Sequence, residues 1–392
     1  MRTICTKALH GAIAVGAIGL AVAVAHGQTG TPRIVGAANA FLETLSEQQR
    51  KSVLYAFDDE QQRARWSNFP IGMVPRGGIS LKEMTPRQRT AAMALVAAAL
   101  SKRGLEKVEQ IMEGDEVNKV EEAKNGNRPR GGFGGPPPPG GGGPPPDFNG
   151  PPGGGPGNGP GGGNRPPFRG GLSADLFGKE LYYISILGKP SEKDPWMLQF
   201  GGHHLALNIT IAGERGVLTP TLTGAQPALY TENGKTVRPL GAESDKALAL
   251  LNALDEGERK QAVLSYHVAD LVLGPGQDGK TIVPEGLKAS AMTEKQRAML
   301  LDVIAEWAGI IHESAAAARM AQLKADINET WFSWSGSTEG EPGKNIKAYY
   351  RIQGPHLVIE YAPQGLGGDL SLHVHTMYRD PTNDYGRGLV KE

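Results

Sequence analysis

Histidine and charged side chains gather near the carboxyl end of the sequence, within residues 349–385. They include His356, Glu360, His373, His375 and Arg379. Alternate side chains of a β-strand point to the same side, so a strand over residues 370–378 places His373 and His375 on one face. Such an H-x-H pair, joined by a histidine from elsewhere, is a common way of holding a divalent metal ion with three imidazoles.

A second run, F-G-G-H-H-L-A-L-N at residues 200–208, is similar to the I-Q-G-P-H-L-V-I-E of residues 352–360. The comparison aligns His204 with His356. If the two runs meet in space, these two rings approach each other and the H-x-H pair completes the cluster. The sequence therefore predicts four candidate metal ligands, which are His204, His356, His373 and His375.

Two further side chains are candidates for a catalytic role. In a strand that includes His356, Glu360 lies on the same face as that histidine, where it can be a fourth ligand or a base acting on metal-bound water. Arg379 can clamp a carboxylate or phosphate group of a substrate. The other interpretation of Arg379 is a structural ion pair with Asp380 or Asp384.

The absence of thiols restricts the choice of metal. The only cysteine, Cys5, falls in the amino-terminal signal described below, so thiolate ligands are excluded from the mature chain. Imidazole ligands outside the cytoplasm favour zinc or copper. Two interpretations without metal remain, a polar ligand site and separate histidines that only stabilise the fold. We expect His203 in the core or supporting a ligand, and His267 and His312 in packing or surface positions.

The amino terminus has the pattern of a secretory signal peptide over residues 1–25. Arg2 and Lys7 precede an apolar stretch, and Ala23-Val24-Ala25 fits the small-x-small cleavage pattern. We therefore expect a periplasmic or extracellular protein without stable membrane insertion after cleavage, the alternative being a retained anchor. Lys plus Arg and Asp plus Glu are balanced at 41 each, which argues against nucleic acid as a partner.

Helical and strand-like patterns alternate along the rest of the chain. The predicted parts are helical residues 26–124, a Gly/Pro-rich insertion at 125–171, strands at 172–235, helical residues 236–328 and strands at 329–392. Ser46 with Gln49, and Thr85 before Pro86, predict helix starts. Residues 196–211 and 347–361 each read as one strand. The insertion is too poor in apolar residues to form a core and is expected to be disordered.

The order helices, strands, helices, strands indicates an internal duplication. Residues 40–50 align with 249–259, and residues 81–89 align with the run that ends at Arg297, at nearly the same offset. The strand runs that contain His204 and His356 align at a smaller offset, as expected if the Gly/Pro-rich tract was inserted into the first half only. The alternative is chance similarity between amphipathic segments.

Several short motifs resemble a bacterial family called domain of unknown function 3500. They are W-S-N-F-P (66–70), R-G-G (76–78), F-G-G-H-H-L-A-L-N (200–208), Y-Y-R-I-Q-G-P-H-L-V-I-E-Y (349–361) and H-V-H-T-M-Y-R-D-P-T-N-D-Y-G (373–386). The resemblance covers nearly all of the chain after the signal, apart from the Gly/Pro-rich tract. It implies a secreted bacterial protein and carries no activity with it.

These patterns together predict an α+β fold built from two similar halves, with helices packed on mostly antiparallel sheets. The function predicted from the residues is that of an exported metal-dependent enzyme, hydrolytic in type, acting on a small or anionic substrate. The alternative is a periplasmic or extracellular protein that binds a metal or another ligand without turnover.

Overall fold

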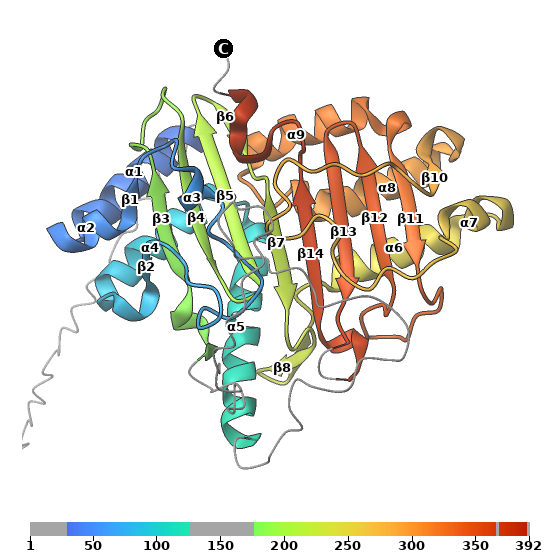
Figure 1. Cartoon of the computed structure of the whole chain (residues 1–392), viewed down its shortest axis with the longest axis horizontal. Coiled ribbons are helices and arrows are strands. Elements are labelled where there is room, and N and C mark those ends of the chain that lie inside the picture. Colours follow the sequence, from blue (N-terminus) through green and yellow to red (C-terminus); the bar gives the residue numbers. More distant parts are fainter. Residues whose placement is uncertain (1–29, 126–175, 366–367, 390–392) are drawn as a thin grey trace, which may run out of the picture.

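The computed structural model describes residues 30–125, 176–365 and 368–389. Helices pack on a large and mostly antiparallel sheet, which confirms the predicted α+β class (Figure 1). The predicted signal peptide, and nearly all of the predicted Gly/Pro-rich insertion, lie outside the described residues. Among the helices that are described, none is long and apolar enough to cross a membrane.

The first half of the described chain has five α-helices. They are α1 (Gly30–Glu43), α2 (Glu47–Val53), α3 (Glu60–Arg63), α4 (Pro86–Ala99) and α5 (Lys102–Asn125). The Ser46 side chain accepts a hydrogen bond from the Gln49 backbone, and Thr85 does the same for Gln88. Both predicted starts are confirmed, because each cap satisfies backbone N–H groups that the first turn leaves unpaired.

The second half has four helices in the described chain, α6 (Gly241–Ala253), α7 (Glu256–Ala262), α8 (Glu294–Ala308) and α9 (Glu313–Ala325). Asp255 caps α7 and Thr293 caps α8, each in a capping box. The predicted helical part, residues 236–328, is interrupted after α7, which ends at Ala262. The chain then runs without regular structure to residue 286.

The large sheet has 12 strands. In the first half they are β1 (Leu54–Tyr55), β2 (Ile79–Ser80), β3 (Tyr183–Leu187), β4 (Trp196–Gly202), β5 (Leu205–Ala212), β6 (Arg215–Val217) and β7 (Thr221–Ala225). In the second half they are β10 (Leu287–Lys288), β11 (Trp331–Ser335), β12 (Tyr349–Gly354), β13 (Leu357–Pro363) and β14 (Val374–Arg379). A separate hairpin joins β8 (Tyr230–Glu232) and β9 (Lys235–Val237).

The strand order is β1-β3-β4-β5-β7-β14-β13-β12-β11-β10, with β2 beside β3 and β6 beside β5. The two halves meet at the antiparallel pair β7 and β14, where Leu222 is opposite Met377. One side-chain hydrogen bond of the first half has a counterpart at the corresponding position of the second half. The Gln88 side chain donates to the Thr44 carbonyl, and Gln296 donates to the Ala253 carbonyl. These correspondences agree with the predicted duplication, which stays a prediction.

Two segments that were each predicted as a single strand form hairpins instead, so these two predictions are wrong. Residues 196–211 form β4 and β5, with a turn at His203 and His204. Residues 347–361 contain β12 and β13, with a turn at Pro355 and His356. The backbone of His204 has φ +59°, in the left-handed region that hairpin turns use. The predicted faces of His204 and His356 assumed strand geometry, which neither residue has.

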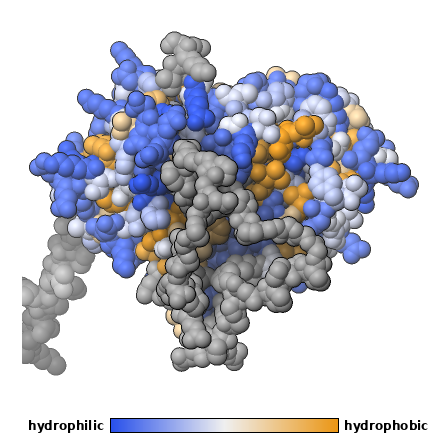
Figure 2. Space-filling view, in the orientation of Figure 1, coloured by the Kyte–Doolittle hydropathy of each residue, from blue (hydrophilic) through white to orange (hydrophobic). Residues whose placement is uncertain are grey.

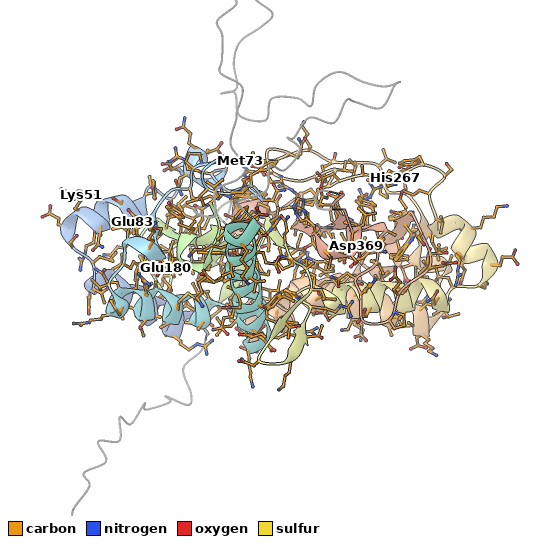
Figure 3. All side chains as sticks on the ribbon, turned by 90° about the horizontal axis from the view of Figure 1, so that it is seen from below. Lys51, Met73, Glu83, Glu180, His267 and Asp369 are labelled. Atoms are coloured by element: carbon orange, nitrogen blue, oxygen red, sulfur yellow. The ribbon has the colours of Figure 1, made fainter. Side chains whose placement is uncertain are left out.

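The two faces of the sheet are covered differently. Helices α1 and α4 pack on one half of the first face, and α6 and α8 on the other. The opposite face is crossed by a first loop (residues 64–78) and a second loop (residues 264–286), which contain Met73 and His267 (Figure 3). Figure 2 shows the loop face, where apolar side chains gather to the right of the centre. Tyr266 and Val283 in the second loop are exposed.

Candidate metal centre

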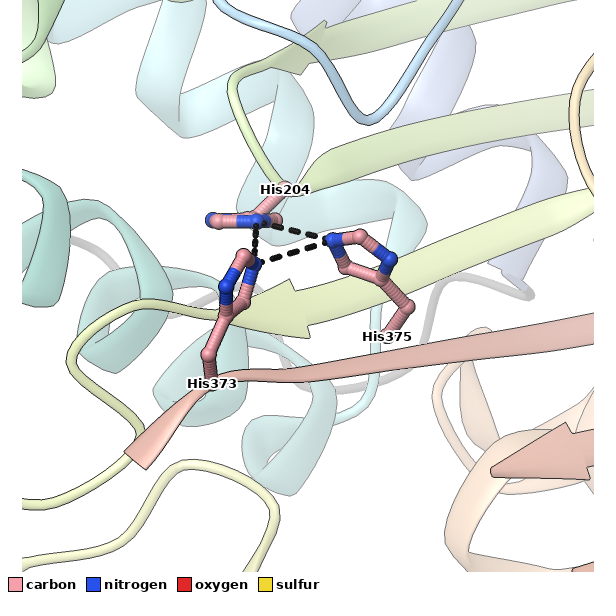
Figure 4. A group of neighbouring side chains, drawn as sticks. All are labelled: His204, His373 and His375. Carbon is pink, nitrogen blue, oxygen red and sulfur yellow. Dashed lines mark hydrogen bonds between the residues drawn. The ribbon is translucent and has the colours of Figure 1, made fainter. Parts of the chain in front are cut away.

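The imidazole rings of His204, His373 and His375 converge at the boundary between the two halves (Figure 4). The Nε2 atom of His204 lies 2.9 Å from that of His373 and 3.1 Å from that of His375. The Nε2 atoms of His373 and His375 are 3.1 Å apart. All three residues are buried, with at most 6% of their surface exposed. Three of the four predicted ligands therefore point toward one position.

Two local features bring these side chains together. His373 immediately precedes β14 and His375 lies on it, so both project from one segment of chain. His204 lies on the β4–β5 turn and reaches past β7, where Gly224 is opposite His375. A Cβ atom on Gly224 would lie 3.1 Å from Cδ2 of His204 and 2.9 Å from the carbonyl oxygen of Val374. The missing side chain at residue 224 therefore leaves room for the His204 ring.

The Nε2 atoms have a spacing that suits a metal ion. Tetrahedral sites with metal–nitrogen bonds of about 2.0–2.1 Å separate neighbouring ligand nitrogens by about 3.3–3.4 Å. The observed separations are shorter by only a few tenths of an ångström. A neutral imidazole has one donor and one acceptor nitrogen, so three Nε2 atoms cannot all be satisfied by one another. A cation between them would satisfy all three lone pairs.

His204 is held in the neutral form that a metal ligand needs. Burial, followed by the neighbouring His203, His373 and His375, lowers the pKa of His204 well below its ordinary value. A charged ring would lose its hydration here and would be repelled by any of the other imidazoles that carried a proton. The lone pair of His204 is therefore available at neutral pH.

Polar groups from both loops approach the far side of the His375 ring. The Asn68 amide nitrogen is 3.3 Å from Nδ1 of His375, and Oδ1 of Asp270 is 3.7 Å from the same atom. Burial raises the pKa of Asp270, but its interaction with the nearby His375 ring lowers it, with a net decrease. Groups that accept a proton from Nδ1 fix the tautomer with Nε2 free for a metal.

The sequence did not identify Asn68 or Asp270 as parts of this site. Asn68 lies in W-S-N-F-P, one of the motifs that resemble the family, so this motif could have pointed to Asn68. The exchange of oxygen and nitrogen in the Asn68 amide would let its oxygen accept the Nδ1 proton. Asp270 has no pattern around it that points to a histidine about a hundred residues away in sequence.

His203 lies behind the cluster, on the helical side of the sheet. Its Nδ1 atom is 2.5 Å from Oδ1 of Asp115 in α5, and its ring centroid is 3.7 Å from that of His204. The backbone carbonyl of His203 accepts a hydrogen bond from Tyr182. These contacts fix the turn that carries His204. Of the other histidines, His312 is buried and His267 is exposed.

The structure does not bring His356 into the cluster. It lies in the β12–β13 turn, where its Nδ1 atom is 2.8 Å from the Thr382 hydroxyl. The residue opposite His375 on β13 is Ala362, which is six positions after His356 in the chain. At about 3.3 Å per strand residue this separates the two histidines by about 20 Å. The prediction failed because the strands that meet at the centre are β7 and β14, which leaves the two turns far apart.

The Glu360 side chain is hydrogen-bonded to the second loop. It is fully buried and accepts hydrogen bonds from the backbone N–H groups of Val272 and Leu273, each at 2.7 Å. The Tyr349 hydroxyl donates a third bond, also at 2.7 Å. Glu360 lies on the same face as His375, but its oxygen atoms point to these donors. Its predicted role as ligand or base has no geometric support.

Arg379 is also engaged in structural contacts. Its guanidinium donates to Asp278 at 2.8 Å and to Asp384 at 2.9 Å. It also donates to the carbonyl groups of Leu273 and Gly274. Of the two interpretations that the sequence left open, the structure favours the ion pair, with Asp384 rather than Asp380 as the partner. Asp380 instead pairs with Arg319.

Comparison with known proteins places the chain in a family. The family model described as "Protein of unknown function (DUF3500)" matches residues 28–387. The chain belongs to the DUF3500 family. No curated protein and no solved structure matches it. The match confirms the resemblance inferred from the motifs, and it includes all three converging histidines, Asn68 and Asp270.

We expect the metal-free protein to lose stability as the pH falls. The unfolded chain takes up a proton on residue 204 near pH 6.5, whereas the folded chain does so only at lower pH. The contribution of neutral His204 is complete above pH 6.5 and is lost as the pH falls toward the folded pKa. The loss is at most about 1.4 kcal/mol per pH unit. Urea unfolding across this range measures it, and an equal slope in His204→Gln would contradict it.

Proposed function

We propose that this protein binds one transition-metal ion through the Nε2 atoms of His204, His373 and His375. The convergence of three buried Nε2 atoms within 2.9–3.1 Å carries this proposal. Without an ion, such an arrangement leaves acceptor atoms facing one another in the protein interior, where unsatisfied polar groups are unfavourable. Zinc and copper suit a site made only of imidazoles.

Binding without turnover is the form of this function that the geometry supports best. Hydrolysis by metal-bound water requires a base near the ion, and the predicted base, Glu360, is already bonded to Val272, Leu273 and Tyr349. The Asp270 carboxylate approaches Nδ1 of His375, and not the Nε2 atom that faces the proposed ion. It can orient the ring but is poorly placed to act on a ligand of the metal.

One observation favours a catalytic role as the second candidate. The described residues supply three ligands, whereas structural zinc sites usually have four protein ligands. Three ligands leave one coordination position for water or a substrate, as in zinc hydrolases. The signal-peptide pattern of residues 1–25 supports a site of action outside the cytoplasm for either candidate.

Metal analysis of the purified mature chain tests the proposal. The protein is stripped with a chelator, then titrated with zinc or copper by calorimetry, and the retained metal is measured after gel filtration. We expect about one ion per chain, and cobalt substitution should give the visible absorption of a tetrahedral site. A folded chain that retains no metal and shows no saturable uptake would overturn the proposal. Ester or phosphoester hydrolysis that requires the metal would favour the second candidate.

A further inference from the structure

A second polar cavity lies near the carboxyl end of β14, away from the histidines. Its volume is about 310 Å³, and its lining includes Arg63 of α3, Asp278 of the second loop, and Tyr385 and Arg387 of the short helix η7 (Asp384–Leu389). Arg379, which bonds to Asp278, is four residues after His375 on β14. This corresponds to about 13 Å along the strand, so the cavity is separate from the candidate metal centre.

Arg63 is a buried cation without a counter-ion. Only 8% of its surface is exposed, yet its guanidinium has no hydrogen bond or ion pair with any other described residue, and its Nε atom is buried without a partner. The guanidinium carbon lies 4.5 Å from the ring centroid of Phe57, which supports it from one side. Buried arginines are nearly always paired, because removing a guanidinium from water is unfavourable. An unpaired one that lines a cavity indicates a missing partner.

A second arginine lies close to the first. Arg387 is placed over the ring of Tyr385, with 5.3 Å between its guanidinium carbon and the ring centroid. Burial lowers the pKa of Arg63, and the positive charge of Arg387 lowers it further, whereas the nearby acidic groups Glu60 and Asp58 raise it. Arg387 has no ion pair within the described chain. The cavity therefore has two guanidinium groups whose mutual repulsion an anion would relieve.

The acidic side chains around this cavity do not neutralise the pair. Asp278 is already committed, with Oδ1 bonded to Arg379 and Oδ2 accepting from the Tyr385 hydroxyl. Glu60 is exposed at the rim and offsets the positive charge only in part. Tyr385 also accepts a hydrogen bond from Trp66, so one wall of the cavity is rigid. Arg387 lies over this fixed aromatic ring.

We infer that this cavity binds a small oxyanion, the carboxylate or phosphate group of a small solute, between Arg63 and Arg387. The planar guanidinium presents paired N–H donors that match the two oxygens of such a group. The volume lies at the lower limit for small-molecule sites, so the whole ligand must be small. The sequence suggested Arg379 as the residue that binds an anion. In this inference the anion is bound by Arg63 and Arg387, which were not among the predicted site residues.

Calorimetric titration with inorganic phosphate and with succinate, at constant ionic strength, tests this inference. The protein is the mature chain carrying His373→Ala, so that a bound metal cannot account for anion uptake. We expect saturable binding of at least one probe, and a loss of about 10–100-fold in affinity in Arg387→Ala, because a hydrogen bond to a charged group is lost. Arg63→Lys should also bind more weakly, since the charge remains but the paired donors are lost.

Arg65→Ala is the matched control. Arg65 is exposed, lies two residues from Arg63, and is not in the lining of this cavity, so its removal changes the net charge equally. We expect its affinity for the probe to stay within about threefold of the parent. Equal weakening in Arg65→Ala and Arg387→Ala would overturn the inference, as would the absence of saturable binding of both probes. Because binding is measured without metal, failure here leaves the proposed metal site unaffected.

Discussion

Replacement of His373 by alanine should remove the bound metal. The change takes away one of three Nε2 atoms that lie 2.9–3.1 Å apart and leaves two imidazoles to hold the ion. Loss of a group that only supports a ligand weakens metal binding by about 10–100-fold, so loss of a ligand should weaken it by more than about 100-fold. At micromolar metal we expect little metal to remain after gel filtration. Plasma mass spectrometry of the purified protein measures it.

His356→Ala is the matched control for this experiment. The same type of residue is removed, but from the β12–β13 turn, where its ring contacts Thr382 instead of the cluster. The variant should keep one ion per chain. Asn68→Ala should be intermediate, with affinity reduced by about 10–100-fold, because Asn68 supports the His375 ring, with its closer contact at Nδ1, and is not one of the three proposed ligands. Equal metal loss in His356→Ala and His373→Ala would refute the assignment of ligands.

Replacement of Glu360 by alanine should destabilise the protein strongly without removing the metal. The substitution leaves the N–H groups of Val272 and Leu273, and the Tyr349 hydroxyl, without their acceptor in a buried position. Each unsatisfied buried donor costs about 1–3 kcal/mol, so with three of them we expect the free energy of unfolding to fall by at least about 3 kcal/mol. Urea unfolding measures the change, and metal content is determined well below the melting temperature.

Glu360→Gln separates a structural role from a catalytic one. Burial raises the pKa of Glu360, while hydrogen bonds from Tyr349, Val272 and Leu273 lower it, with a net increase. An uncharged side chain of the same shape should therefore be tolerated better than alanine, because it still offers one acceptor oxygen. If Glu360 were a ligand or a base, Glu360→Gln would lose metal or turnover while keeping its stability. That result would restore the role predicted from the sequence.

Local patterns were sufficient for the features that depend on neighbouring residues. The caps at Ser46 and Thr85 predicted helix starts correctly, because a cap bonds to backbone only three residues away. The alternation of helical and strand patterns predicted the α+β class. The pair His373 and His375 was also found, because side chains of a strand alternate over a distance of two residues. His204 was found through its similarity to a second motif, although that motif's own histidine is not at the site.

Tertiary structure decided the composition of the site and the fate of the charged residues. The pairing of β7 with β14 brought His204 beside the H-x-H pair and left His356 about 20 Å away. Which strands become neighbours depends on burial over the whole chain, and no short motif records it. For the same reason Glu360 and Arg379 have their partners in the second loop, which lies within a part of the chain that was predicted to be helical. The sequence by itself determined which residues can bind a metal, whereas the packing of two loops and two strands determined which of them meet.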